Sequence, residues 1–180
     1  MSTKEKISDI NFDDLRILKY PDPRLSEVSA AVETFDEDLR TLAENMVELM
    51  FRSRGVGLAA PQVGVGVRMF IASPSFDLDN LRVYINPQIL LAEGAESGEE
   101  GCLSFPDVHC QIKRSTRIVI QAFDLEGRQF RETCDDLHAR ICQHENDHLE
   151  GCLLVDRMGS IARLSHRKTL QTLRDAYEKD

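Results

Sequence analysis

The chain has 180 residues, of which 42% are hydrophobic; this length suits one buried core and is short for two independent domains. Its formal net charge of −9, with 22 Lys and Arg against 31 Asp and Glu, argues against general nucleic-acid binding, which needs a basic face. The longest weakly polar run is broken by glycine and proline and falls short of bilayer length, so no membrane association is expected. We therefore expect a single domain over residues 1–180.

The first ten residues, MSTKEKISDI, mix lysines with acidic side chains and contain no apolar stretch. Neither a secretory signal nor a transit peptide is visible in them, so we expect a flexible arm over about residues 1–10 and a cytoplasmic location.

The five cysteines are an odd number. In a reducing compartment they are expected to be thiols or metal ligands before they are disulfides.

Residues 33–55 predict the first long helix, because their apolar side chains recur at helical spacing. These side chains are Leu39, Leu42, Met46, Val47 and Met50. Thr34 and Glu37 have the spacing of a capping box at its start, and Gly55 is the expected stop.

The middle of the chain predicts strands of antiparallel sheet, because short β-branched or alternating stretches are separated by turn formers. These stretches are residues 67–73, 81–90, 116–124 and 128–134. Two further helices are expected at about residues 135–150, ending at Gly151, and at about residues 160–177. The pattern predicts an α+β fold, with antiparallel β-sheets packed around a central helix, a long N-terminal helix and a C-terminal helix.

The sequence CQHENDHLEGC lies on the predicted central helix. His144 and His148 are four residues apart and so share one helical face, where both rings can reach one ion and Glu145 can handle a proton. Leu137 and Ile141 continue the stripe, which predicts that the histidines point into the core. An HExxH pattern in such a helix favours metal binding over chance.

The neighbouring thiols and the later histidine are weaker candidates for the third ligand. Cys142 lies about 200° around the helix from His144, and Cys152 follows the expected helix end, so both are interpreted as core thiols. His166 lies among basic residues on what is predicted to be a solvated face. The missing ligand is therefore expected upstream of the helix.

Two upstream segments carry candidate residues. EGCLSFP holds Cys102 in a strand-like setting, and GVGLAAPQ is a glycine-rich loop after the first helix. Taken singly, Cys102 would more often be a buried thiol and the loop only a tight helix exit. Together with QHENDH, in this order and at these separations, they closely resemble the peptide deformylases. The resemblance runs from ILKYPDPRL to LLVDRM and covers most of the chain.

The resemblance implies three metal ligands, Cys102, His144 and His148, with water as the fourth. It also implies that Glu145 is the catalytic acid and base. Gln62, through its side-chain amide, and Leu103, through its backbone N–H, would bind the oxyanion of the substrate. Gly57 would lie along the bound peptide.

The implied reaction is removal of the formyl group from the N-terminal methionine of new polypeptides, with release of formate. The implied cofactor is one divalent ion, Fe(II) as the working metal, with Zn(II), Ni(II) or Co(II) as replacements. Glu100 and Arg114 are expected to form a supporting charge pair.

Two alternative functions stay open at this point. A metallopeptidase would share the metal and Glu145 but cut internal amide bonds, and a non-catalytic metal-binding or redox-sensing domain would keep the ligands without needing Glu145. The basic C-terminal segment would suit weak docking on the ribosome. Its acidic residues favour a merely solvated face instead.

Overall fold

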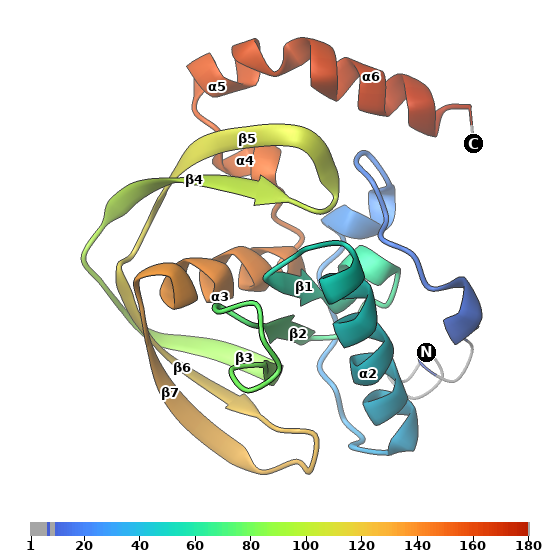
Figure 1. Ribbon diagram of the computed structural model, residues 1–180, viewed down its shortest axis with the longest axis vertical. Helices are drawn as coiled ribbons and strands as arrows, with labels where there is room; N and C mark the ends of the chain where they lie inside the picture. Colours follow the sequence, from blue (N-terminus) through green and yellow to red (C-terminus); the bar gives the residue numbers. More distant parts are fainter. Residues whose placement is uncertain (1–6, 8–9, 180) are drawn as a thin grey trace.

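The computed structural model describes residue 7 and residues 10–179. Most of the expected N-terminal arm therefore lies outside the described residues. The fold is mixed α+β, with antiparallel sheets and helices (Figure 1). Three short 3-10 helices join its parts: η1 (Phe12–Asp14), η2 (Pro23–Ser26) and η3 (Ala60–Val63).

The larger sheet has five strands in the order β1-β2-β3-β6-β7, and every neighbouring pair is antiparallel. The strands are β1 (Gly57–Ala59), β2 (Met69–Ala72), β3 (Arg82–Glu93), β6 (Arg117–Phe123) and β7 (Gln129–Asp135). The predicted strands are confirmed at β2, β3, β6 and β7. β1 is too short to leave a periodic pattern in the sequence.

β3 continues through a proline because the sheet bulges there. The register shifts between Ile85 and Gln88, on either side of Asn86 and Pro87. Pro87 has no N–H to give to the ladder, and Asn86 takes a positive φ of 50°. The Asn86 side chain exchanges two hydrogen bonds of 2.8 Å with the backbone of Val32, which holds this conformation.

The second sheet is a two-stranded ribbon of β4 (Glu96–Cys102) and β5 (Phe105–Arg114). Val108, Cys110 and Ile112 alternate with exposed residues along β5 and pack into a core of their own. This strand is not among the predicted ones, although its alternation is present in the sequence.

Helix α2 (Glu37–Arg52) lies at one edge of the larger sheet and buries the predicted apolar stripe. It begins later than the expected capping box, because the Asp36 carboxylate, and not Thr34, accepts the N–H of Leu39 at 3.2 Å. The Thr34–Glu37 capping box is therefore wrong. The chain turns after the helix, where the N–H of Gly55 reaches the carbonyl of Met50.

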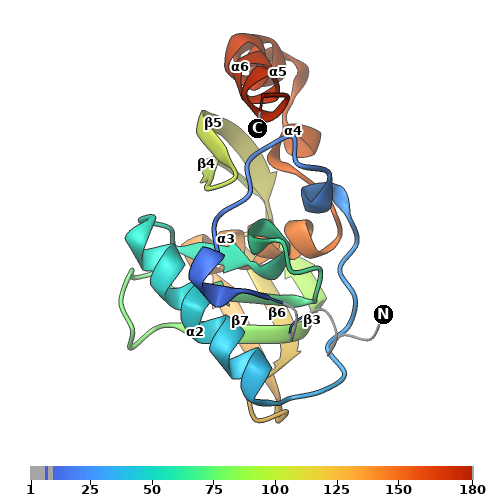
Figure 2. The ribbon, with the colours of Figure 1, turned by 90° about the vertical axis from the view of Figure 1, so that its right-hand side faces the viewer.

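Helix α3 (Asp136–Leu149) is the central element, as the sequence predicts. Figure 2 shows it between the five-stranded sheet and the β4–β5 ribbon, with the C-terminal helices beyond the ribbon. Its sheet side belongs to a buried cluster with residues of β2, β3 and β6: Ala139, Cys142, Leu149, Phe70, Tyr84, Ile118 and Ile120. Leu137 was expected in the core but is 52% exposed, because its position at the first turn lies beside an open cavity.

The expected C-terminal helix is split in two. After the short α4 (Leu154–Arg157) come α5 (Ser160–Ser165) and α6 (Arg167–Tyr177). The break is at His166, whose ψ of 4° leaves the helical range while its Nε2 donates to the carbonyl of His109 in β5 at 2.8 Å. None of the helices in the described part of the chain is both long and apolar enough to cross a membrane.

Candidate metal centre

Cys102, His144 and His148 meet between the ribbon and α3. Their donor atoms all lie within 4.8 Å of one another, and Cys102 Sγ is 3.4 Å from His148 Nε2. The two histidines come from successive turns of α3. Cys102 ends β4, where a register shift between Gly101 and Cys102 changes the course of the strand beside the helix.

This donor set fits a metal ion. His144 Nδ1 lies 2.9 Å from the Glu100 carboxylate, which leaves Nε2 of that ring free to face the other donors. No fourth His, Cys, Asp or Glu of the described residues joins this group of three. One thiolate and two imidazoles suit zinc or other late transition metals, and three protein ligands leave a position for water or substrate.

A buried ion network fixes the ribbon to the helix behind these ligands. Glu100 receives two hydrogen bonds of 3.0 Å from Arg114 and a third of 2.8 Å from Arg140. Arg114 also binds Asp147 at 2.5 Å, and Arg157 holds the same carboxylate. Burial favours the neutral form of Glu100, but hydrogen bonds from His144 and Arg114 outweigh it and lower the pKa of Glu100 to about 2.

The expected Glu100–Arg114 pair is therefore present, and it belongs to a larger network. Asp147 was not recognised as part of it. The signal was available, because an acidic residue inside HENDH and next to His148 must lie close to the ligand face or find a cation.

Glu145 lies beside the ligands and is 4% exposed. Burial raises the pKa of its carboxyl group to about 7, with the positive charge of His144 opposing that shift. Its Oε2 has no hydrogen-bond partner among the described residues. A Cβ atom at Gly57 would collide with this carboxylate, so the absence of a side chain at Gly57 lets β1 pass close to it.

Gln62 is buried on η3, and its side chain is held at both ends. Its Oε1 accepts the backbone N–H of Ala59 at 2.9 Å. Its Nε2 faces Ser104 Oγ at 3.1 Å and Cys102 Sγ at 3.5 Å. Leu103 occupies the turn between β4 and β5, and its carbonyl accepts a hydrogen bond of 2.5 Å from Lys19.

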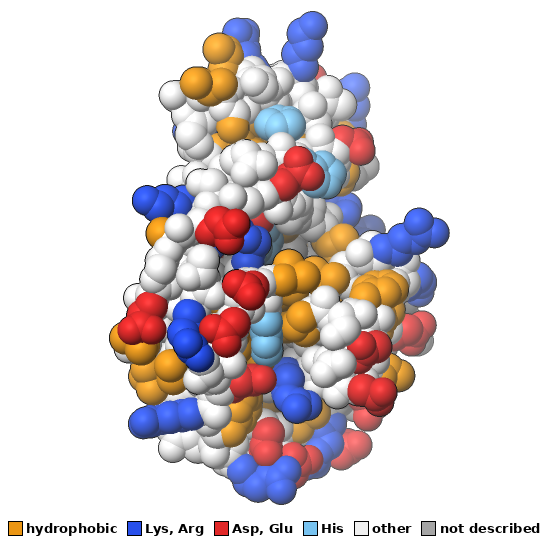
Figure 3. Space-filling model, turned by 60° about the vertical axis from the view of Figure 1, so that its left-hand side comes forward, with side chains coloured by type: hydrophobic (Ala, Val, Ile, Leu, Met, Phe, Trp, Pro, Cys, Tyr) orange, Lys and Arg blue, Asp and Glu red, His pale blue; other side chains and the backbone are white. Residues whose placement is uncertain are grey.

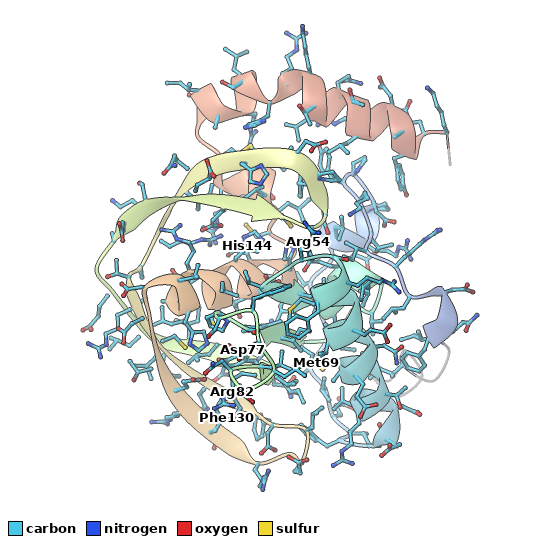
Figure 4. The ribbon with its side chains drawn as sticks, in the orientation of Figure 1. Arg54, Met69, Asp77, Arg82, Phe130 and His144 are labelled. Atoms are coloured by element: carbon cyan, nitrogen blue, oxygen red, sulfur yellow. The ribbon has the colours of Figure 1, made fainter. Side chains whose placement is uncertain are left out.

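One cavity of about 320 Å³ is lined by the predicted site residues other than His148: Gly57, Gln62, Cys102, Leu103, His144 and Glu145. Leu103, Leu137 and Ile141 give it apolar walls. Figure 4 shows His144 between α3 and the ribbon, close to Arg54, which also lines the cavity. In Figure 3 this face is hollowed near its middle, with histidine, hydrophobic and acidic side chains around the hollow. Arg54 and Arg140 at this cavity were not recognised from the sequence.

The arrangement defines a class of protein, the metal-dependent hydrolases with an HExxH helix and an open metal position. Comparison with known proteins identifies the family within this class of hydrolases. The family model of polypeptide deformylases matches residues 14–164.

Among curated relatives, a peptide deformylase of Alkalilimnicola ehrlichii is 44% identical over 160 residues, which cover 88% of this chain and 90% of the relative. Arabidopsis thaliana peptide deformylase 1B, chloroplastic/mitochondrial, is 37% identical over 176 residues, covering 96% of this chain and 64% of the relative. A crystal structure of peptide deformylase from Plasmodium falciparum has a TM-score of 0.89 at 34% identity, covering 91% of this chain and 98% of that one.

The chain belongs to the peptide deformylase family. It is a metal-dependent hydrolase with peptide deformylase activity, and the resemblance seen in the sequence is confirmed.

Glu100→Gln is expected to lower the free energy of unfolding by about 3 kcal/mol at pH 7, because hydrogen bonds from His144 and Arg114 lower the pKa of Glu100 to about 2 in the folded protein. This contribution is fully present above the unfolded pKa and is lost as the pH falls towards 2. The gap between wild type and variant should therefore narrow steadily as the pH is lowered from 5 towards 2. Urea unfolding of both proteins at each pH measures this difference in unfolding free energy, and a chelator in the buffer prevents interference from metal release.

Glu99→Gln is the matched control, because Glu99 precedes Glu100 on β4 and is exposed. It should change the unfolding free energy by less than about 0.5 kcal/mol. A gap for Glu100→Gln that stays the same at every pH would contradict the ionic role of Glu100.

Proposed function

We propose that Cys102, His144 and His148 hold the catalytic metal of this deformylase and that Glu145 carries the proton of the reaction. The observation that supports this most strongly is the convergence of the three donors within 4.8 Å beside a buried carboxylate. When bound, the metal would polarise the formyl oxygen and lower the pKa of a coordinated water towards neutrality.

Glu145 is suited to take the proton of the attacking water and return it to the leaving amine. A pKa near 7 lets one carboxyl group serve as base and then as acid at neutral pH. In the overall reaction, water adds its oxygen to the formyl carbon and the C–N bond breaks. The amine gains a proton, and formate leaves.

The oxyanion that develops during this attack needs donors close to the formyl group. We propose that the Gln62 amide and the backbone N–H of Leu103 supply them, since both residues line the cavity beside Cys102. Gln62 is held in place through its Oε1, so its Nε2 needs little reorganisation to serve. Gly57 would lie along the bound peptide.

The substrate is proposed to be a nascent polypeptide that begins with formylmethionine. The apolar walls of the cavity suit an unbranched thioether side chain, while the polar groups gather on one side of it.

One domain over residues 1–180 is proposed to contain the whole active site. The five unpaired cysteines support a reducing compartment, and we propose the cytoplasm.

Fe(II) is proposed as the working ion, with Zn(II), Ni(II) or Co(II) as replacements. The donor set accepts any of these ions. A thiolate beside ferrous iron would make the centre sensitive to oxygen, because that thiolate can be oxidised.

Weak docking of the C-terminal helices on ribosomal RNA is a further part of this proposal. Three of the basic residues there already have partners: Arg157 binds Asp147, Arg163 binds the carbonyl of Val155, and Arg174 binds the hydroxyl of Tyr20. Arg167 and Lys168 are exposed and are left to face an anionic surface.

Glu145→Gln is expected to reduce kcat/KM for formate release from formyl-Met peptides by about 100-fold or more, because proton transfer is lost. Metal content should stay unchanged, since the three ligands remain. Glu150→Gln, at the exposed end of the same helix, should keep wild-type activity. Full activity of Glu145→Gln would remove the assigned role.

Protein made and purified without oxygen is expected to contain iron and to have the highest formate release per metal ion. Brief exposure to peroxide should reduce that activity, while protein reloaded with zinc should resist the same treatment. Equal activity and unchanged metal content after aerobic purification would argue against iron.

Replacing both Arg167 and Lys168 by glutamate is expected to weaken binding to purified ribosomes, with the largest effect at low salt. The same charge change made by Arg117→Glu and Arg131→Glu, on the five-stranded sheet, is the control. Co-sedimentation at several salt concentrations measures both. Equal binding of the two double variants would exclude docking through these two side chains.

A further inference from the structure

A second group of metal-ligating side chains lies on the other side of α3. Cys134 comes from the end of β7, and His138 and Cys142 come from the first turns of the helix. Their donor atoms all lie within 4.8 Å of one another. This group shares no residue with the deformylase centre.

The spacing of the chain explains the convergence. His138 and Cys142 are four residues apart and share a helical face, and Cys134 ends the strand that leads into the helix. Cys142 and His144 differ by about 200° around α3, so this face points away from the deformylase ligands and towards the five-stranded sheet. α3 thus carries two ligand faces.

The distances approach those of a tetrahedral site. Cys134 Sγ is 3.7 Å from His138 Nε2. In a zinc site, metal–sulfur and metal–nitrogen bonds of about 2.3 and 2.05 Å place sulfur and nitrogen about 3.5 Å apart. The donors therefore need only small shifts to bind one ion.

The surroundings make a purely packing role costly. Cys134 and Cys142 are fully buried in a cluster of apolar side chains. Into this cluster the protein also brings the imidazole of His138 and the hydroxyl of Tyr84, 2.8 Å apart. Apolar residues would fill the same space without any need to satisfy polar atoms. Shared coordination of an ion accounts for two thiols and an imidazole meeting at one point.

Tyr84 is the nearest further donor. Its hydroxyl lies 2.8 Å from Glu132 as well as from His138, so it stays anchored by Glu132 when His138 turns its lone pair to an ion. Glu132 also lines a surface hollow of about 510 Å³ with Arg82 and Phe130, both labelled in Figure 4. None of the three thiol and imidazole side chains lines this hollow, and His138 is the one of them that is partly exposed.

We propose that Cys134, His138 and Cys142 form a second metal site, for a thiophilic divalent cation such as Zn²⁺, which ties β7 to α3. Two sulfurs and one nitrogen exclude Mg²⁺ and Ca²⁺, which prefer oxygen ligands. Binding releases two thiol protons to solvent and transfers no electrons, and the two thiolates balance the charge of the ion.

The test is the number of ions that the protein holds after anaerobic loading with Co²⁺ in the presence of reductant. Wild type is expected to hold two ions per chain, and the double variant Cys134→Ala, Cys142→Ala one. Cys110→Ala is the matched control, because it removes a buried thiol outside both groups, and it should keep two ions. The thiolate-to-cobalt absorption should fall by more than half in the double variant, since it loses two of the three coordinating sulfurs.

Cys102→Ala supplies the complementary result. It should lose the ion of the deformylase centre and keep one ion whose absorption shows two thiolates. This keeps the test valid where the double variant fails to fold.

Wild type that holds one ion per chain would overturn the proposal. The same conclusion would follow from a double variant that folds and holds as many ions as wild type. Unreduced protein that shows only three titratable thiols, with Cys134 and Cys142 joined in a disulfide and no second ion after reduction, would also overturn it.

Discussion

The buried pairing of Glu100 with Arg114 is the interaction on which the rest of the site depends. It joins β4 to β5 and, through Asp147, joins both strands to α3. The same carboxylate orients His144. A buried charge without its partners would cost several kcal/mol, so these residues are stable only as a set. The set brings a thiol of the ribbon to two imidazoles of the helix.

Position on α3 decides what each polar residue does. His144 and Glu145 line the cavity and His148 meets Cys102, while Cys142 packs against the sheet and His138 contacts Tyr84 of β3. The helix has polar groups on both sides because each side meets a different set of partners. Its stability therefore rests on satisfied polar contacts as much as on apolar packing.

Much of the fold can be predicted from the sequence, because α2, α3 and four strands have regular patterns of apolar residues. The exceptions have local causes. Asp36 competes with Thr34 for the first N–H groups of α2, and His166 leaves the helical range where it binds β5. Leu137 matches the apolar period of α3 but faces a cavity, which periodicity alone does not show. The alternation of apolar and polar residues along β5 is regular, so this strand could also have been predicted from the sequence.

The residues of the candidate site could be predicted from the sequence in part, and for a different reason. His144 and His148, four residues apart on one helix, predict from their spacing alone that their rings share a face. Cys102 has no such local pattern, and only the likeness of three separated motifs to a family connects it to them. The network behind the ligands depends on contacts between residues far apart in the chain, such as Arg114 with Asp147. No local spacing encodes these contacts.

Residues 25–29 pack against residues 149–154, which lie far away in the sequence. The N–H of Ser29 bonds to the carbonyl of Leu149, and Gly151 passes so close to Ser26 that a Cβ atom there would strike its backbone. Leu25 shares its core with Leu153 and Leu154. During synthesis, about 130 further residues must therefore be added after Leu25 before its neighbours Leu153 and Leu154 exist. An enzyme that acts on emerging chains can complete this part of its own core only after the segment that follows α3 has itself emerged.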